Sequence, residues 1–137
     1  MFITIAIVCK WINNYSKLLN ENWGIKIPAT AHCRQIYEMD SGPSFHGDGI
    51  RYHIFSYKNE DDIKDMLAWR SDEGITIFNQ SYSEAVNAWL DRITVSYSHR
   101  PNYNECCYWY QTKDDNSEVL VLWDKSQSKL YIVESFL

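Results

Sequence analysis

Residues 44–49, Ser-Phe-His-Gly-Asp-Gly, bring a hydroxyl, an imidazole and a carboxylate into one short, glycine-rich segment. Side chains of these types bind ligands and transfer protons, and the glycines let the backbone approach a ligand closely. The segment therefore predicts a binding loop formed by Ser44, Phe45, His46 and Asp48. A purely structural loop is the alternative, in which Asp48 accepts hydrogen bonds from amides of its own turn and Phe45 anchors the loop to the core.

This loop lacks the pattern of a catalytic serine. In the Gly-x-Ser-x-Gly elbow of hydrolases a glycine stands two residues after the serine, whereas this chain has His46 in that place. Three residues that alternate along one loop also rarely converge into a triad. We therefore predict no catalytic residue, and the sequence favours a protein that is not an enzyme.

A small metal-dependent hydrolase is an alternative function. His46 and Asp48 would be two of its ligands, and His32 or His53 would arrive from a neighbouring strand. The chain has four histidines, and no His-x-x-x-His or Glu-x-x-His spacing places two ligands on one helix face. We therefore predict neither a metal site nor a cofactor.

Aromatic residues supply a second candidate surface. They make up 15% of the chain, and several lie between residues 97 and 110. Tyr and Trp are enriched in protein interfaces, so Tyr103 and Trp109 join the predicted binding residues. The net charge of −5 opposes contact with nucleic acid and favours a protein partner, in particular a basic one.

The length and cysteine content predict one globular domain over residues 1–137. A chain of this size builds a single core, and 45% apolar with 23% charged residues is an ordinary globular composition. The four cysteines have no Cys-x-x-Cys spacing, which argues against zinc and against a disulfide framework. We expect reduced thiols, with Cys106 and Cys107 on opposite faces of a strand.

The apolar run over residues 2–9 predicts a first strand. No basic residue precedes it, and it is far shorter than the ~20 residues that span a bilayer. We therefore expect no integral membrane segment and a cytoplasmic protein. If the natural chain began further upstream, the run would instead be the end of an anchor, and the protein an envelope-associated ligand-binding domain.

Apolar residues at three- and four-residue steps predict three helices. These cover residues 11–23, a segment from Asn59 towards Trp69, and residues 81–93. Gly24 is expected to end the first helix, Asn59 to cap the second, and Ser81 with Glu84 to form a capping box on the third. Residues 75–78 are expected to be a separate short apolar segment.

Five further runs predict strands. They cover residues 29–40, 50–57, 105–112, 118–123 and 129–136. The second run alternates between two faces, with Ile50, Tyr52, Ile54 and Ser56 on one face and Arg51, His53, Phe55 and Tyr57 on the other. The pattern predicts an α+β domain with a twisted, mostly antiparallel sheet, about three helices packed on a face of it, and a C-terminal three-strand meander.

The segment that ends in Phe45-His46-Gly47-Asp48-Gly49, followed by a strand and an acidic helix, carries a resemblance. The chain resembles a group of small uncharacterised proteins of Gram-positive bacteria that have a Phe-His-Gly-Asp-Gly element. Many members begin with a membrane anchor or lipoprotein signal, and this chain departs from that pattern. The resemblance implies no activity, so the expected function is a non-enzymatic interaction protein, of the kind of bacterial immunity proteins.

Overall fold

The computed structural model of the chain describes residues 14–28, 33–42, 49–69 and 76–136. Five strands form one sheet in which all neighbouring pairs are antiparallel. The strands are β1 (Cys33–Asp40), β2 (Gly49–Tyr57), β3 (Cys106–Thr112), β4 (Glu118–Asp124) and β5 (Lys129–Phe136). Their order is β1-β2-β5-β4-β3, so the hairpin β1-β2 lies beside the meander β3-β4-β5. The predicted α+β fold with its C-terminal meander is confirmed.

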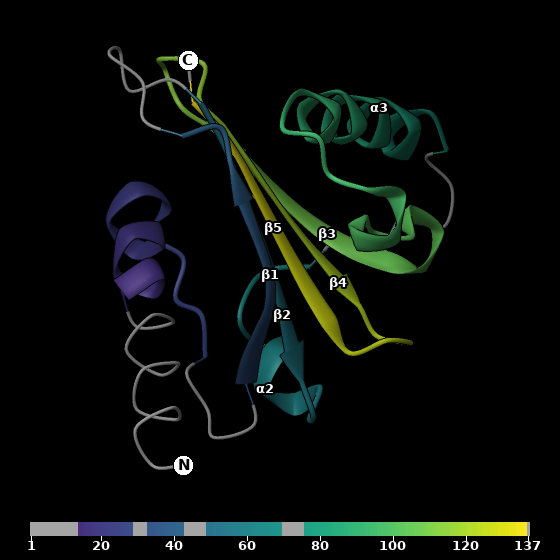
Figure 1. The fold of residues 1–137 in the computed structure, drawn as a ribbon. Helices are drawn as coiled ribbons and strands as arrows, with labels where there is room; N and C mark the ends of the chain where they lie inside the picture. Colours follow the sequence, from purple (N-terminus) through teal and green to yellow (C-terminus); the bar gives the residue numbers. More distant parts are fainter. Residues whose placement is uncertain (1–13, 29–32, 43–48, 70–75, 137) are drawn as a thin grey trace.

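Helices cover both faces of this sheet (Figure 1). The N-terminal helix (residues 14–23) and α2 (Asp61–Lys64) pack on one face. The longer α3 (Thr76–Arg92) packs on the opposite face, where two 3-10 turns, η1 (Tyr97–His99) and η2 (Tyr103–Glu105), follow it. The sequence suggested a single covered face, and the difference arises because β4 and β5 are apolar on both sides.

Alternation along the strands divides the core in two. On β2, Tyr52 and Ile54 are buried beneath α3, whereas Phe55 and Tyr57 are buried beneath the N-terminal helix and α2. Cys106 and Cys107 also point to opposite faces, as predicted, and both are free thiols. The faces predicted for β2 are therefore confirmed.

The prediction for α3 was wrong at its start. Residues 76–78, expected in a separate segment, already belong to the helix, so Ser81 lies inside it and not at its N-terminus. In α2 the helical part is one turn, and Glu60 rather than Asn59 holds the cap position. Asn59 still accepts a hydrogen bond through Oδ1 from the Asp61 amide at 3.1 Å.

Some predictions fall on residues that are not described. The strand expected over residues 2–9, the first part of the helix expected over residues 11–23, and residues 29–32 of the next strand lie outside the described residues. Within the described ranges, no helix combines the length and apolar character that crossing a membrane requires.

Gly24 ends the N-terminal helix as predicted. Its φ is +71°, and its amide donates to the Asn20 carbonyl at 2.8 Å. A Cβ placed on Gly24 would meet nothing within 4 Å, so any cost of substitution is conformational rather than steric.

Replacing Gly24 by alanine is therefore expected to lower the free energy of unfolding by about 1 kcal/mol, because only glycine enters the left-handed region without penalty. Gly24→Asn should lose less, since asparagine tolerates this conformation better than alanine. Urea unfolding of both variants measures the difference. Equal stability of Gly24→Ala and the wild type would contradict the assignment.

Candidate functional site

The sheet face beneath the N-terminal helix changes from apolar to polar along β2. Phe55 and Tyr57 belong to the apolar core of this face, whereas Arg51 and His53 occupy the same face nearer the start of the strand. In register, Arg51 lies opposite Glu134 of β5. Three ionisable side chains thus lie on one end of a face that is otherwise apolar.

Glu134 is a carboxylate with no exposed surface, and the N-terminal helix supplies its hydrogen bonds. The Tyr15 hydroxyl donates to Oε1 at 2.6 Å, and the Trp23 indole N–H donates to Oε2 at 3.0 Å. Burial, together with the charge of Glu134, raises the pKa of Tyr15 well above its ordinary value, so the hydroxyl keeps its proton. One carboxylate of β5 therefore holds the N-terminal helix at two positions, Tyr15 and Trp23.

His53 is 6% exposed and stacks on the Tyr15 ring, with centroids 3.6 Å apart. Burial, and then the nearby Arg51 charge, lower the pKa of His53 to about 4. The imidazole is therefore neutral at neutral pH, and one of its two nitrogens is an acceptor.

Two hydrogen bonds identify that acceptor nitrogen. The Gln35 Nε2 amide donates to Glu38 Oε2 at 3.0 Å, which directs Gln35 Oε1 towards His53 Nδ1 at 3.2 Å. Because an amide oxygen only accepts, His53 Nδ1 carries the proton and Nε2 is the free acceptor. Glu38 thus sets the tautomer of His53 through Gln35.

Arg51 is a half-buried cation to which no described residue offers a hydrogen-bond acceptor. Its guanidinium carbon lies 4.9 Å from the centroid of the Phe136 ring, and Nη1 is buried. Among the described residues, no hydrogen bond or ion pair to the Arg51 guanidinium is present. The planar fork, which suits carboxylate and phosphate groups, therefore carries no hydrogen bond to the part of the chain that the structure describes.

A β-bulge brings two carboxylates of β1 to the same face. The register shifts between Gln35 and Tyr37, so that Glu38 pairs with His53 and Asp40 pairs with Arg51. Asp40 Oδ1 accepts a hydrogen bond from the Gly42 amide at 2.8 Å rather than from its cross-strand partner. Without the bulge, alternation would turn Glu38 and Asp40 to the α3 face.

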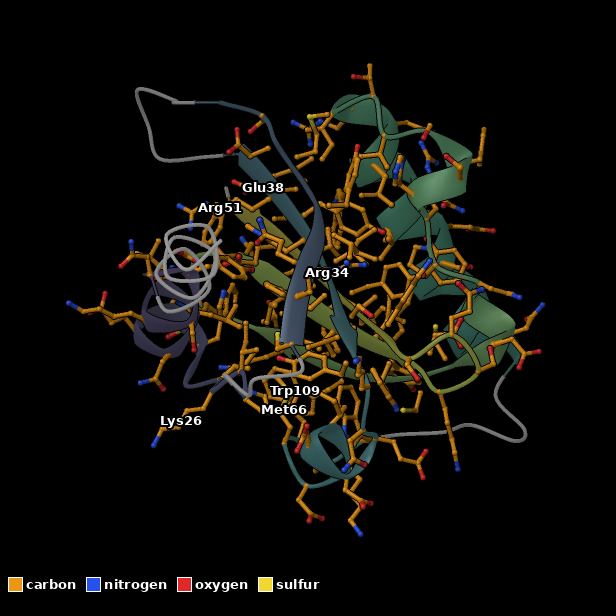
Figure 2. The ribbon with its side chains drawn as sticks, turned by 60° about the horizontal axis from the view of Figure 1, so that its bottom comes forward. Lys26, Arg34, Glu38, Arg51, Met66 and Trp109 are labelled. Carbon is orange, nitrogen blue, oxygen red and sulfur yellow. The ribbon has the colours of Figure 1, made fainter. Side chains whose placement is uncertain are left out.

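These side chains line a cavity of about 220 Å³ between the N-terminal helix and the β1-β2 hairpin. We call it the polar pocket. Its lining consists of Asn14, Tyr15, Leu18, Gln35, Glu38, Asp40, Arg51 and His53. Figure 2 shows Glu38 and Arg51 close to the N-terminal helix, at the end of the sheet away from α2.

The predicted binding loop connects the two strands that form the pocket. Ser44, Phe45, His46 and Asp48 themselves lie outside the described residues. The loop begins and ends at Ser41 and Ile50, where the Ser41 amide donates to the Ile50 carbonyl and the Ile50 amide donates to Ser41 Oγ, both at 2.9 Å. These anchor residues directly follow Asp40 and precede Arg51, so the loop starts and finishes beside the pocket.

Tyr103 and Trp109, the other two predicted binding residues, lie on opposite faces of the sheet. Tyr103 packs on the α3 side and donates its hydroxyl to Asn87 Oδ1 at 3.0 Å. Trp109 packs on the other side, near Met66 and α2 (Figure 2). They do not form one surface with each other, and neither lines the polar pocket.

The described residues hold no group of three His, Cys, Asp or Glu side chains that could bind a metal ion. His53, proposed as a ligand for a metal, is instead stacked on Tyr15; His32, His46 and Asp48 lie outside the described residues. Burial raises the pKa of Cys106 and of Cys107, which keeps both thiols protonated and unreactive.

Sequence reasoning placed Arg51 and His53 on the face of Phe55 and Tyr57 without treating them as a site. The available signal was the combination of a cation and an imidazole with two large aromatic residues on one strand face. A charged residue on a face of this kind needs either a buried partner or a ligand.

Tyr15→Phe is expected to lower the free energy of unfolding by about 1–3 kcal/mol, because a buried carboxylate loses a hydrogen bond. Tyr110→Phe is the matched control, since Tyr110 donates to Glu118 Oε1 at the partly exposed edge of the sheet. That variant should lose less than about 1 kcal/mol. Equal losses in chemical unfolding would show that burial of Glu134 does not determine the effect.

His53 should make stability depend on pH. The unfolded imidazole binds a proton near pH 6.5 and the folded one only near 4, so between these values the unfolded state binds more protons. Stability therefore falls as the pH is lowered, by about 2 kcal/mol from this group between pH 7 and 5. His53→Phe keeps the aromatic stack and should remove this component, measured as the difference in unfolding free energy at the two pH values. An unchanged pH dependence would be inconsistent with a neutral, buried His53.

Comparison of the chain with protein-family models, with curated proteins and with solved structures finds no match. The inferences about function below therefore rest on the polar pocket and its surroundings.

Proposed function

We propose that this protein is a non-enzymatic binding protein and that its partner, a protein with a basic contact surface, engages the polar pocket and the adjoining loop 44–49. The observation that carries the binding site is the Arg51 guanidinium, half-buried in the pocket wall without a hydrogen bond to a described residue, whereas the basic character of the partner rests on Glu38 and Asp40. Buried polar groups in folded proteins are normally paired, so an unpaired one beside a cavity favours a ligand.

Charge supports a basic partner. Two carboxylates, Glu38 and Asp40, line the pocket against one guanidinium, and His53 is neutral. Neither carboxylate forms an ion pair with a described residue. The pocket lies between the N-terminal helix and the β1-β2 hairpin, and β1 is the edge strand of the sheet, so a partner can reach it.

The titratable groups of the pocket favour binding over catalysis. A general base works best with a pKa near the working pH, whereas the pKa of His53 is about 4. The Tyr15 hydroxyl, with its raised pKa and its bond to Glu134, is a poor nucleophile. These groups are suited to giving and accepting fixed hydrogen bonds.

The test is affinity capture from the native cell with the full chain as bait. Arg51→Gln, His46→Ala and Asp48→Ala are expected to retain the fold and to lose a protein that the wild type captures. Arg34→Gln is the control, since Arg34 is an exposed cation on β1 outside the pocket lining, and it should capture the protein normally.

Two results would overturn the proposal. One is capture of the same proteins by the wild type and by all four variants. The other is stoichiometric metal in the purified protein together with its loss in His46→Ala and Asp48→Ala, which would favour the metal-dependent hydrolase instead.

A further inference from the structure

We infer that the polar pocket recognises a basic amino-acid residue with a free carboxylate, either the C-terminal Lys or Arg of a polypeptide or the free amino acid. The inference rests on the proposed function, since it names the chemical group that the pocket binds. It follows from the way in which donors and acceptors are divided around one small cavity.

The donor side is the Arg51 guanidinium. Its position over the Phe136 ring leaves the edge of the fork, with its N–H groups, free of acceptors from the described residues. Phe136 does not line the pocket, so pairing with a carboxylate there requires the terminal torsions of Arg51 to turn the fork from Phe136 towards the cavity. Bidentate pairing with a planar oxyanion is the interaction that this group makes best.

The acceptor side comprises three groups. Glu38 and Asp40 each use one oxygen, for the Gln35 amide and the Gly42 amide respectively, and each keeps the other oxygen free of described partners. His53 Nε2 is the third acceptor, because its tautomer is fixed by Gln35. Acceptors of this number and charge suit an ammonium or guanidinium group, which has several N–H donors and no acceptor.

Together these sides specify a ligand that carries both charges. A cation alone would leave the half-buried Arg51 without an acceptor, whereas an anion alone would make no use of the attraction of Glu38 and Asp40, which are exposed and hydrated when no ligand is bound. The buried Glu134 opposite Arg51 adds further negative potential on this face, which favours a ligand with at least as much positive as negative charge. Lysine and arginine with a free carboxylate meet both requirements.

The volume of the polar pocket agrees with a ligand of one amino-acid residue. A cavity of about 220 Å³ is smaller than the ~300–1,000 Å³ of sites for drug-sized ligands. The Tyr15 ring and Leu18 on the N-terminal helix offer apolar surface for the methylene groups of a long basic side chain.

The experiment is isothermal titration calorimetry of the full chain with four probes. They are acetyl-Ala-Ala-Lys with a free carboxylate, the same peptide as its amide, acetyl-Ala-Ala-norleucine, and free L-lysine. Amidation and the change to norleucine are each expected to weaken binding by about tenfold or more, because each removes a charged hydrogen-bonding group. Binding of L-lysine but not of the acetylated peptide would identify the free amino acid as the source.

Variants test which residue causes each difference in affinity between the probes. Arg51→Gln should bind the acid and the amide equally, and the pair Glu38→Gln with Asp40→Asn should bind the lysine and norleucine peptides equally. Arg51→Lys keeps the charge without the fork, and serves if Arg51→Gln fails to fold. Arg34→Gln is expected to match the wild type in all titrations.

The inference is overturned if no probe binds at about 10 mM, or if the wild type binds the acid and the amide with the same affinity. Loss of a captured protein in Arg51→Gln, combined with no binding of any probe, would retain the proposed function and reject this ligand. In a third case, Arg51→Gln captures the same cellular proteins as the wild type, while the wild type still distinguishes the probes in calorimetry. That result would reject the protein partner and retain the amino-acid site.

Discussion

Burial of both faces of β4 and β5 is the constraint on which the rest of the structure depends. From Val119 to Trp123 each side chain of β4 is buried, and β5 is buried from Leu130 to Ser135. Strands of this kind need cover on two sides, and α3 supplies one side while the N-terminal helix and α2 supply the other. Removal of either layer would expose half of the sheet to water.

Charged residues on such strands need their own partners. Asp124, fully buried at the end of β4, accepts hydrogen bonds through Oδ1 from the Ser126 hydroxyl at 2.6 Å and the Gln127 amide at 3.1 Å, which form the following turn, whereas its Oδ2 has no partner among the described residues. Glu134 has no such local partner, and its hydrogen bonds come from Tyr15 and Trp23, more than 100 residues away in sequence. A long-range polar contact therefore positions the N-terminal helix, in addition to its apolar face.

The position of that helix creates the polar pocket. Tyr15 both binds Glu134 and stacks on His53, so the contact that fixes the helix also forms a wall of the pocket. The bulge after Gln35 then turns Glu38 and Asp40 towards the same space. Stability and the candidate site thus share residues, which is why Tyr15 is unsuited as a probe of binding alone.

Local patterns predicted much of the fold. The end of the N-terminal helix at Gly24, the strands of the meander and the two faces of β2 all follow from spacing or from the conformational freedom of one residue. The start of α3 was predicted too late because Ser81 and Glu84 have the residue types and spacing of a capping box. The helix already includes residues 76–80. Sequence spacing alone does not show whether a capping motif lies at a terminus or within a helix.

The pocket could not be predicted in the same way. It combines residues 14–18 of the N-terminal helix, a bulged edge strand and the start of the next strand, and the bulge changes which β1 residues share a face with β2. A strict alternation from Gln35 would have turned Glu38 and Asp40 away from Arg51. The sequence showed only that β2 carries Arg51 and His53 on one face. Whether they form a pocket depends on β1 and the N-terminal helix, which pack against that face.

Arg51 has no hydrogen-bond acceptor within the described ranges, and this is the strongest reason to propose the pocket as a site rather than a packing feature. Asp40 is its cross-strand partner, and a side chain as long as arginine could pair with it. Instead Asp40 accepts from the Gly42 amide, and the guanidinium lies over Phe136. If the pocket served only the fold, pairing Arg51 with Asp40 would satisfy both groups without a ligand. The separation of these two charges keeps a donor and an acceptor available on either side of one cavity, which is what recognition of a ligand with both charges requires.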